Sequence, residues 1–168
     1  MNDNGLIEEY KSFLTQYTRD QLCYIPEPGV WSVGQMYDHL IVVAHEYLDS
    51  VDACEKVAGE QKQGKTEFGE RLFRNGGFPP IKIKLPAELD APPDNSKTRE
   101  EILLELDRLS ERMKRLEMKV EDINPLSKVE HGGFGWLNAK EWLDLVSMHF
   151  CHHLRQKERM DHQLKNCK

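Results

Sequence analysis

Two histidines near the end of the sequence, His149 and His153, lie four residues apart. On an α-helix this spacing places both imidazoles on one face, about 6 Å apart along the helix axis. Two imidazoles so placed can share one metal ion. A third histidine, His39, lies beside the apolar stripe of an earlier segment with helical periodicity. A fold that brings the two segments together would therefore close a three-histidine site.

Such a site would hold a divalent transition-metal ion. Neutral imidazole suits zinc, nickel, copper or iron, and we expect zinc or nickel. Three protein ligands leave coordination positions for water or substrate, which distinguishes a reactive site from a closed structural one. The alternative is that these are core histidines with hydrogen-bond partners. Without partners, each buried imidazole nitrogen would cost about 1 to 3 kcal/mol, so three of them in one apolar seam favour the metal site.

Three further polar residues lie near these histidines in the sequence or on the predicted helix. Gln156 follows His153 by three residues, where its amide could orient a ligand or a bound water. His131 begins a glycine-rich turn and is a candidate proton shuttle, fourth ligand or substrate contact, or simply a loop residue. His152 is one position off the stripe, so we expect it in helix packing or at the rim. His131 and Gln156 are thus the candidate catalytic residues.

The segments that would position these residues are helical. Helical periodicity of apolar residues marks four of them, at about 6–22, 32–59, 98–120 and 138–164. Three begin with a capping residue followed three positions later by Gln or Glu, namely Ser32 with Gln35, Thr98 with Glu101, and Asn138 with Glu141. The pattern predicts an all-α protein whose helices pack as a bundle.

A long connection separates the second and third predicted helices. Residues 60–97 contain five prolines and four glycines, a density that breaks any long helix. The run 81–85 alternates as a short strand would, but it has no evident partner, so we interpret it as extended loop. Loops of this length tend to be lids, binding loops or disorder.

The composition argues against nucleic acid and membranes as binding partners. The chain has 168 residues, which predicts one domain over 1–168, and its formal charge of -6 is a poor match to nucleic acid. No apolar run is long enough to span a bilayer, and the first residues lack the layout of a signal peptide, so we expect a cytoplasmic protein without a membrane partner. The four cysteines form no C-x-x-C pair, which predicts separate reduced thiols.

Two motifs carry a resemblance to a known family. Residues 149–156 read H-x-x-H-H-x-x-Q and resemble the last helix of the DinB/YfiT-like superfamily. Residues 31–40, in which Trp31 precedes His39, resemble the second helix of that superfamily. The resemblance implies a four-helix bundle, a divalent ion held by His39, His149 and His153, and a homodimer. Residues 131–137 are similar to one branch of the superfamily in which proline commonly follows the histidine, whereas Gly132 stands here.

Three functions fit these features. The superfamily suggests thiol-dependent transfer, in which a metal-bound low-molecular-weight thiol attacks a small electrophilic substrate. Metal-assisted hydrolysis is the second, although no glutamate follows His149 in an H-E-x-x-H arrangement. The third is a non-catalytic protein that stores or senses a metal or ligand, or a stress-associated dimer.

Overall fold

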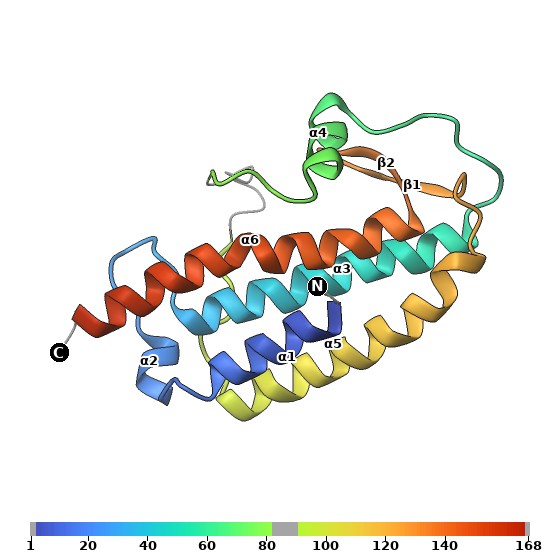
Figure 1. Cartoon of the computed structure of the whole chain (residues 1–168). Helices are drawn as coiled ribbons and strands as arrows, with labels where there is room; N and C mark the ends of the chain where they lie inside the picture. The colour runs from blue at the N-terminus through green and yellow to red at the C-terminus, as the bar shows by residue number, and fades with distance from the viewer. Residues whose placement is uncertain (1–2, 82–90, 167–168) are drawn as a thin grey trace.

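The structure is a computed structural model that describes residues 3–81 and 91–166, with side chains described for 5–81 and 91–165. Four long helices run side by side (Figure 1): α1 (Asp3–Leu14), α3 (Val33–Lys56), α5 (Arg99–Lys119) and α6 (Ala139–Asn166). The shorter elements are α2 (Arg19–Cys23), α4 (Glu67–Asn75), the 3-10 turn η2 (Val120–Asp122), and the strands β1 (Lys128–His131) and β2 (Gly135–Asn138). The described chain is mostly helical, which confirms the predicted class. No helix among the described residues is both long and apolar enough to cross a membrane.

The core lies where the apolar faces of the long helices meet. Helix α3 packs against α5 and α6, and α1 packs against the same two helices. Two buried tyrosines connect these elements, because the Tyr10 hydroxyl donates to the carbonyl oxygen of Phe150 at 2.8 Å and the Tyr37 hydroxyl donates to that of Tyr10 at 2.7 Å. These hydrogen bonds satisfy polar groups that would otherwise be costly to bury.

The three predicted capping residues lie at helix starts. At Ser32, the side-chain oxygen accepts from the Gln35 amide at 3.1 Å, and the Gln35 side chain accepts from the Ser32 amide at 3.0 Å. The same reciprocal pair forms at the starts of α5 and α6, between Thr98 and Glu101 and between Asn138 and Glu141. These pairs satisfy amides that have no partner within a helix, and they fix where α3, α5 and α6 begin.

The first predicted helix, 6–22, is divided. Helix α1 ends at Leu14, and α2 begins at Arg19 after an extended residue, Thr18. Thr18 and Gln21 form a further capping box, so the local hydrogen bonds favour a new helix start over a continuous helix.

The described part of the connection 60–97 contains a helix, α4, that was not predicted. Thr66 caps α4 by accepting from the Gly69 amide, and Gly76 ends the helix in the left-handed region with φ 67°. Of the run 81–85, residues 82 onward lie outside the described residues. The hairpin of β1 and β2 was not predicted either; the glycine-rich turn joins its two strands.

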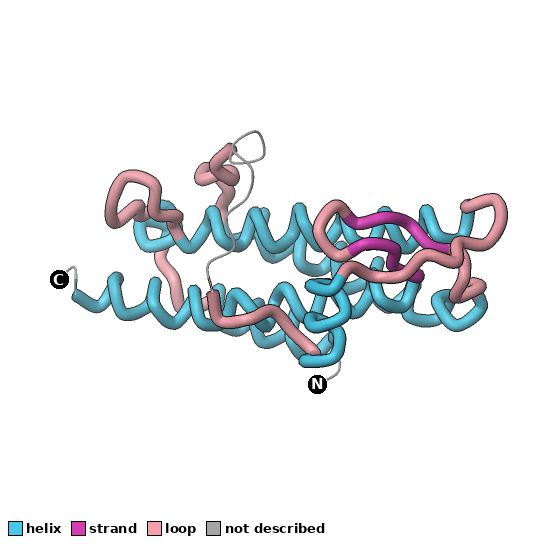
Figure 2. The backbone as a smooth tube through the Cα atoms, turned by 90° about the horizontal axis from the view of Figure 1, so that it is seen from above, coloured by secondary structure: helices cyan, strands magenta, loops and turns pink. Residues whose placement is uncertain are grey.

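Helix α4 and the hairpin form one layer on the side of α3 and α6 that faces away from α1 and α5 (Figures 1 and 2). The Thr66 amide donates to the Phe134 carbonyl at 2.8 Å, and the Trp136 amide donates to the Gly64 carbonyl at 3.1 Å. Gly69 allows this approach, since a Cβ there would lie 2.3 Å from the Phe134 oxygen. An ion pair between Lys65 and Glu141 ties the layer to the start of α6.

Candidate metal centre

Three histidine side chains converge between α3 and α6. The Nε2 atom of His149 lies 3.1 Å from that of His39 and 3.1 Å from that of His153. Each residue offers one ring nitrogen within 4.8 Å of the others. The structure therefore brings together the three residues that the sequence singled out, although His39 is 110 positions away from His149 in the chain.

The packing of α3 on α6 produces this convergence. His39 lies next to Leu40, which is fully buried, and His149 lies next to Phe150, which is 1 % exposed. His149 and His153 are themselves only 7 % and 8 % exposed, whereas His39 is partly exposed. The centre is thus buried at His149 and His153 and more exposed at His39.

The spacing of the nitrogens suits a metal ion. A tetrahedral ion with bonds of about 2.0 to 2.1 Å would hold its ligand nitrogens about 3.4 Å apart, close to the observed 3.1 Å. Hydrogen bonds among the rings cannot satisfy all three Nε2 atoms, because a proton on His149 Nε2 can be donated to only one of the two neighbouring nitrogens. A cation at the common point would satisfy all three lone pairs, so the donor set fits a divalent ion.

Gln156 orients one of the three rings. Its Oε1 atom lies 2.5 Å from His153 Nδ1. Because an amide oxygen only accepts, the proton is on Nδ1 and the lone pair of Nε2 faces the centre. Gln156 thus contacts the ring of His153, which lies one turn before it on α6. His149 has no such support, since its buried Nδ1 lacks a hydrogen-bond partner among the described residues.

All three rings are held in the neutral form that binds metals. Burial lowers the pKa of His39 and of His153 to about 4. Burial and the neighbouring histidines lower the pKa of His149 well below its ordinary value. At neutral pH the three imidazoles are therefore uncharged and would need no deprotonation to bind an ion.

Aromatic side chains surround the three histidines. The Trp31 ring lies 4.9 Å from His39, and the rings of Tyr47 and Phe78 lie 6.0 and 6.2 Å from His149. Sequence reasoning missed Phe78, which follows α4 and reaches the centre only because α4 docks on the hairpin. These rings place apolar surface against the histidines, and electrostatic interactions are stronger next to apolar surface than in water.

His131 and His152 lie outside the cluster. The His131 Nδ1 accepts from the amides of Gly133 and Phe134 at 3.0 and 3.3 Å, and its ring stacks on Phe134 at 4.0 Å. It closes the hairpin turn and is not gathered with the three histidines. The His152 ring lies 5.3 Å from His153, with its buried Nδ1 unpartnered among the described residues. His152 thus lies beside the three-histidine group and is not part of it.

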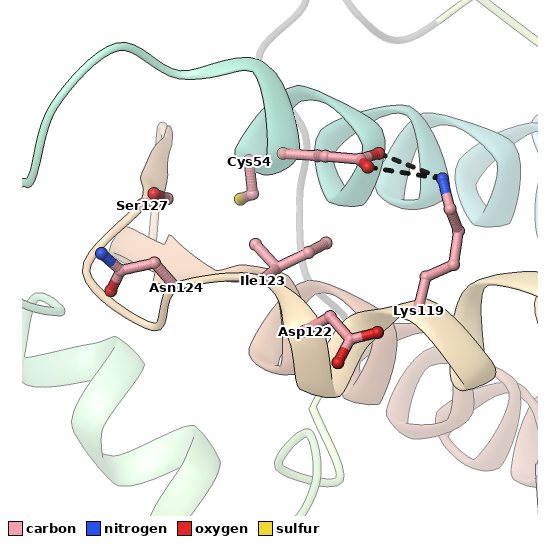
Figure 3. Close-up of a pocket in the computed structure, with 7 residues that line it drawn as sticks. Cys54, Lys119, Asp122, Ile123, Asn124 and Ser127 are labelled. Atoms are coloured by element: carbon pink, nitrogen blue, oxygen red, sulfur yellow. Dashed lines mark hydrogen bonds and ion pairs between the residues drawn. The ribbon is translucent and has the colours of Figure 1, made fainter.

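A separate surface pocket of about 250 Å³ lies at the other end of α3 (Figure 3). It is about 20 Å along the helix from His39. Its lining is Cys54, Glu55, Lys119, Asp122, Ile123, Asn124 and Ser127. Glu55 and Lys119 pair with each other, and burial raises the pKa of Cys54 to about 11, so its thiol is protonated at neutral pH. This pocket offers neither an ordinary metal-ligand set nor an activated nucleophile.

The fold and the histidine cluster define a mostly helical protein with a candidate metal centre between two helices. A family model, that of the DinB superfamily, matches residues 6–156. The chain therefore belongs to the DinB superfamily. No curated protein and no solved structure matches it.

Proposed function

We propose that this DinB-superfamily protein binds one divalent ion, zinc or nickel, through His39, His149 and His153. The observation that carries the proposal is the convergence of three Nε2 atoms from two helices on one point. In this proposal α1, α3, α5 and α6 form the four-helix bundle of the superfamily, within one domain over 1–168. We also propose a homodimer, on the basis of the resemblance, and a cytoplasmic location, on the basis of the sequence.

We further propose that the site performs thiol-dependent transfer. A divalent ion with open positions lowers the pKa of a bound thiol or water and so supplies a nucleophile at neutral pH. The residues of this chain would provide the rest. The three histidines fix the ion and Gln156 orients His153, while Trp31 and the Tyr47 ring place apolar surface against the histidines. In that reaction the thiol would lose its proton to solvent and its sulfur would form a bond to the electrophilic carbon, while the bond from that carbon to the leaving group breaks and the leaving group departs with the electron pair.

Metal-assisted hydrolysis is the alternative reaction. It would need a general acid or base near the bound water. In the part of the chain that the structure describes, the ligand cluster contains histidines and no carboxylate. One acidic residue at the start of α6, Glu141, is already engaged, since it pairs with Lys65 and caps the helix. The geometry therefore favours the thiol reaction over hydrolysis. Non-catalytic binding of a metal or ligand is the third candidate function.

One set of assays separates these functions. The zinc- or nickel-loaded protein is incubated with a chromogenic aryl halide, with and without a small thiol, and in parallel with ester and amide substrates. We expect loss of the electrophile that requires the thiol, exceeds the uncatalysed rate, and is absent in His149→Ala. Hydrolysis without thiol would select the second function. Inertness towards both panels would leave metal or ligand binding.

A further inference from the structure

The His131 ring closes the hairpin turn through a nitrogen that accepts hydrogen bonds. Its Nδ1 accepts from the backbone amides of Gly133 and Phe134 at 3.0 and 3.3 Å. A ring nitrogen that accepts carries no proton, so the neutral ring has its proton on Nε2. A second proton would go to Nδ1, where it would face two N–H groups. Both hydrogen bonds therefore require the neutral form of His131.

The side chains packed against His131 also favour the neutral form. Its ring stacks on Phe134 with the centroids 4.0 Å apart, and it lies 6.2 Å from the ring of Tyr47 on α3 and 5.4 Å from that of Trp142 on α6. Phenylalanine and tryptophan do not titrate, and burial raises the pKa of Tyr47, so that side chain is uncharged as well. Burial lowers the pKa of His131 below its ordinary value of 6.5.

No carboxylate compensates a positive charge on His131. Glu141, which precedes Trp142 on α6, pairs with Lys65. Glu46 on α3 and Glu130 on β1 are exposed, and Glu130 points to the opposite face of its strand. Within the described ranges His131 forms no ion pair, and burial alone accounts for the shift of its pKa. Protonation would therefore cost both amide hydrogen bonds without a new favourable contact.

The same turn attaches the layer of α4 to the molecule. The Thr66 amide donates to the Phe134 carbonyl at 2.8 Å, and the Thr66 hydroxyl donates to the Gly133 carbonyl at 2.9 Å. The Phe134 ring packs at 5.8 Å on Phe78, which in turn lies 6.2 Å from the ring of His149. The two residues whose amides bond to the histidine are thus the two that bind the start of α4.

We propose that His131 is a pH-sensitive switch that holds the layer of α4 and the hairpin in place. The neutral ring closes the turn and keeps Phe78 beside the candidate centre. When the ring gains a proton, the two amide bonds are lost, the turn opens, and the Phe78 side of the centre becomes accessible to water. This inference goes beyond the proposed function and needs no metal ion.

The direction of the pH dependence follows from proton linkage. A proton binds more tightly to the open turn, where the ring has its ordinary pKa of 6.5, than to the closed turn, where burial lowers the pKa. The closed turn is therefore fully favoured above pH 6.5 and becomes less favoured as the pH falls from there through the lowered pKa. Between about pH 7.5 and about pH 5, the opening equilibrium should rise by up to roughly 30-fold.

Hydrogen exchange of the metal-free protein, followed by mass spectrometry, tests the inference. Peptides that cover 66–78 and 131–137 report on α4 and on the turn, and peptides from α5 report on the bundle. The test variant is His131→Asn, because the asparagine oxygen is bonded to Cγ as Nδ1 is, accepts from the same amides, and does not titrate. The matched control is His162→Asn, whose side chain is exposed on α6.

Rates are compared between proteins at the same pH, so the intrinsic pH dependence of exchange cancels. At about pH 7.5, wild type and His131→Asn should exchange equally. At about pH 5, the wild type should exchange roughly three- to thirtyfold faster than His131→Asn in both segments, and equally in α5. His162→Asn should behave as the wild type does.

Equal rates for wild type and His131→Asn at about pH 5 would overturn the inference, as would faster exchange that leaves 66–78 unaffected. Nitrogen-15 NMR of the wild-type protein gives a test that does not depend on the folding of a variant. His131 should show an unprotonated Nδ1 at neutral pH and a titration midpoint below 6.5. A proton on Nδ1, or a midpoint at or above that value, would contradict the switch. Because no metal is present, failure of zinc to bind would leave this inference standing.

Discussion

A single hydrogen bond at His153 decides which ring nitrogen faces the centre. Gln156 accepts at 2.5 Å from Nδ1, which leaves the Nε2 lone pair directed at His149 and His39. Burial keeps the rings neutral, so the arrangement is ready for an ion without the loss of a proton. At the residue scale, three histidines alone do not make a candidate metal centre. Their rings must also be neutral and must direct the Nε2 lone pairs at a common point.

Gln156→Leu should weaken zinc binding about 10- to 100-fold, because the support that orients a ligand is removed while the ligand stays. Competition with a chromophoric chelator measures the affinity. Gln163→Leu is the matched control, since Gln163 is exposed on the same helix. Equal zinc affinity in the two variants would contradict the role assigned to Gln156.

The layer of α4 and the hairpin is the element that completes the site. It carries Phe78 to within 6.2 Å of the His149 ring, and its own contact with the turn passes through Gly69 and Phe134. The rings of Phe68 and Phe78 pack on Phe134 at 5.7 and 5.8 Å and hold the layer together.

Gly69→Ala should destabilise the protein by about 1 to 3 kcal/mol, because the new methyl group would lie far inside contact distance of the Phe134 carbonyl. Urea denaturation measures the free energy of unfolding. In Gly132→Ala, where no atom lies within 4 Å of the added Cβ, we expect a change within about 0.5 kcal/mol. Similar stabilities for the two variants would argue against the docked layer.

The sequence predicted the long helices better than this layer. The capping boxes at Ser32, Thr98 and Asn138 are local signals, and the structure uses all of them. The equivalent signal at Thr18 was overlooked because the apolar stripe continues through it. Strands of four residues and a nine-residue helix among glycines carry too little periodicity to predict.

The residues of the candidate centre also differ in how well the sequence predicts them. His149 and His153 share a helix face at a spacing that any α-helix imposes, and the stripe places His39 inward, so their convergence was predictable. Phe78 and the closure of the turn by His131 depend on tertiary docking, which no local pattern records.

At the scale of the whole molecule, the candidate centre links the two halves of the chain. His39 belongs to α3 and the other two histidines to α6, which pack directly on each other. An ion bound at this point would hold segments together that are far apart in the unfolded chain. Metal binding should therefore be coupled to stability.

Zinc at 100 times its dissociation constant should stabilise the folded protein by about 2.7 kcal/mol. For a chain of this size that corresponds to a rise in Tm of about 5 to 10 °C. Thermal unfolding followed by circular dichroism, with and without zinc, measures the shift. We expect no rise in His39→Ala; a rise of the same size in that variant would place the ion elsewhere.

The zinc content of the protein after equilibrium dialysis tests the central claim most directly. Elemental analysis should find one ion per chain in the wild type and in His162→Ala, whose side chain is exposed on the same helix. His149→Ala, which removes the nitrogen that contacts both other histidines, should retain far less than one ion. One tightly bound ion per chain in His149→Ala would contradict the three-histidine centre.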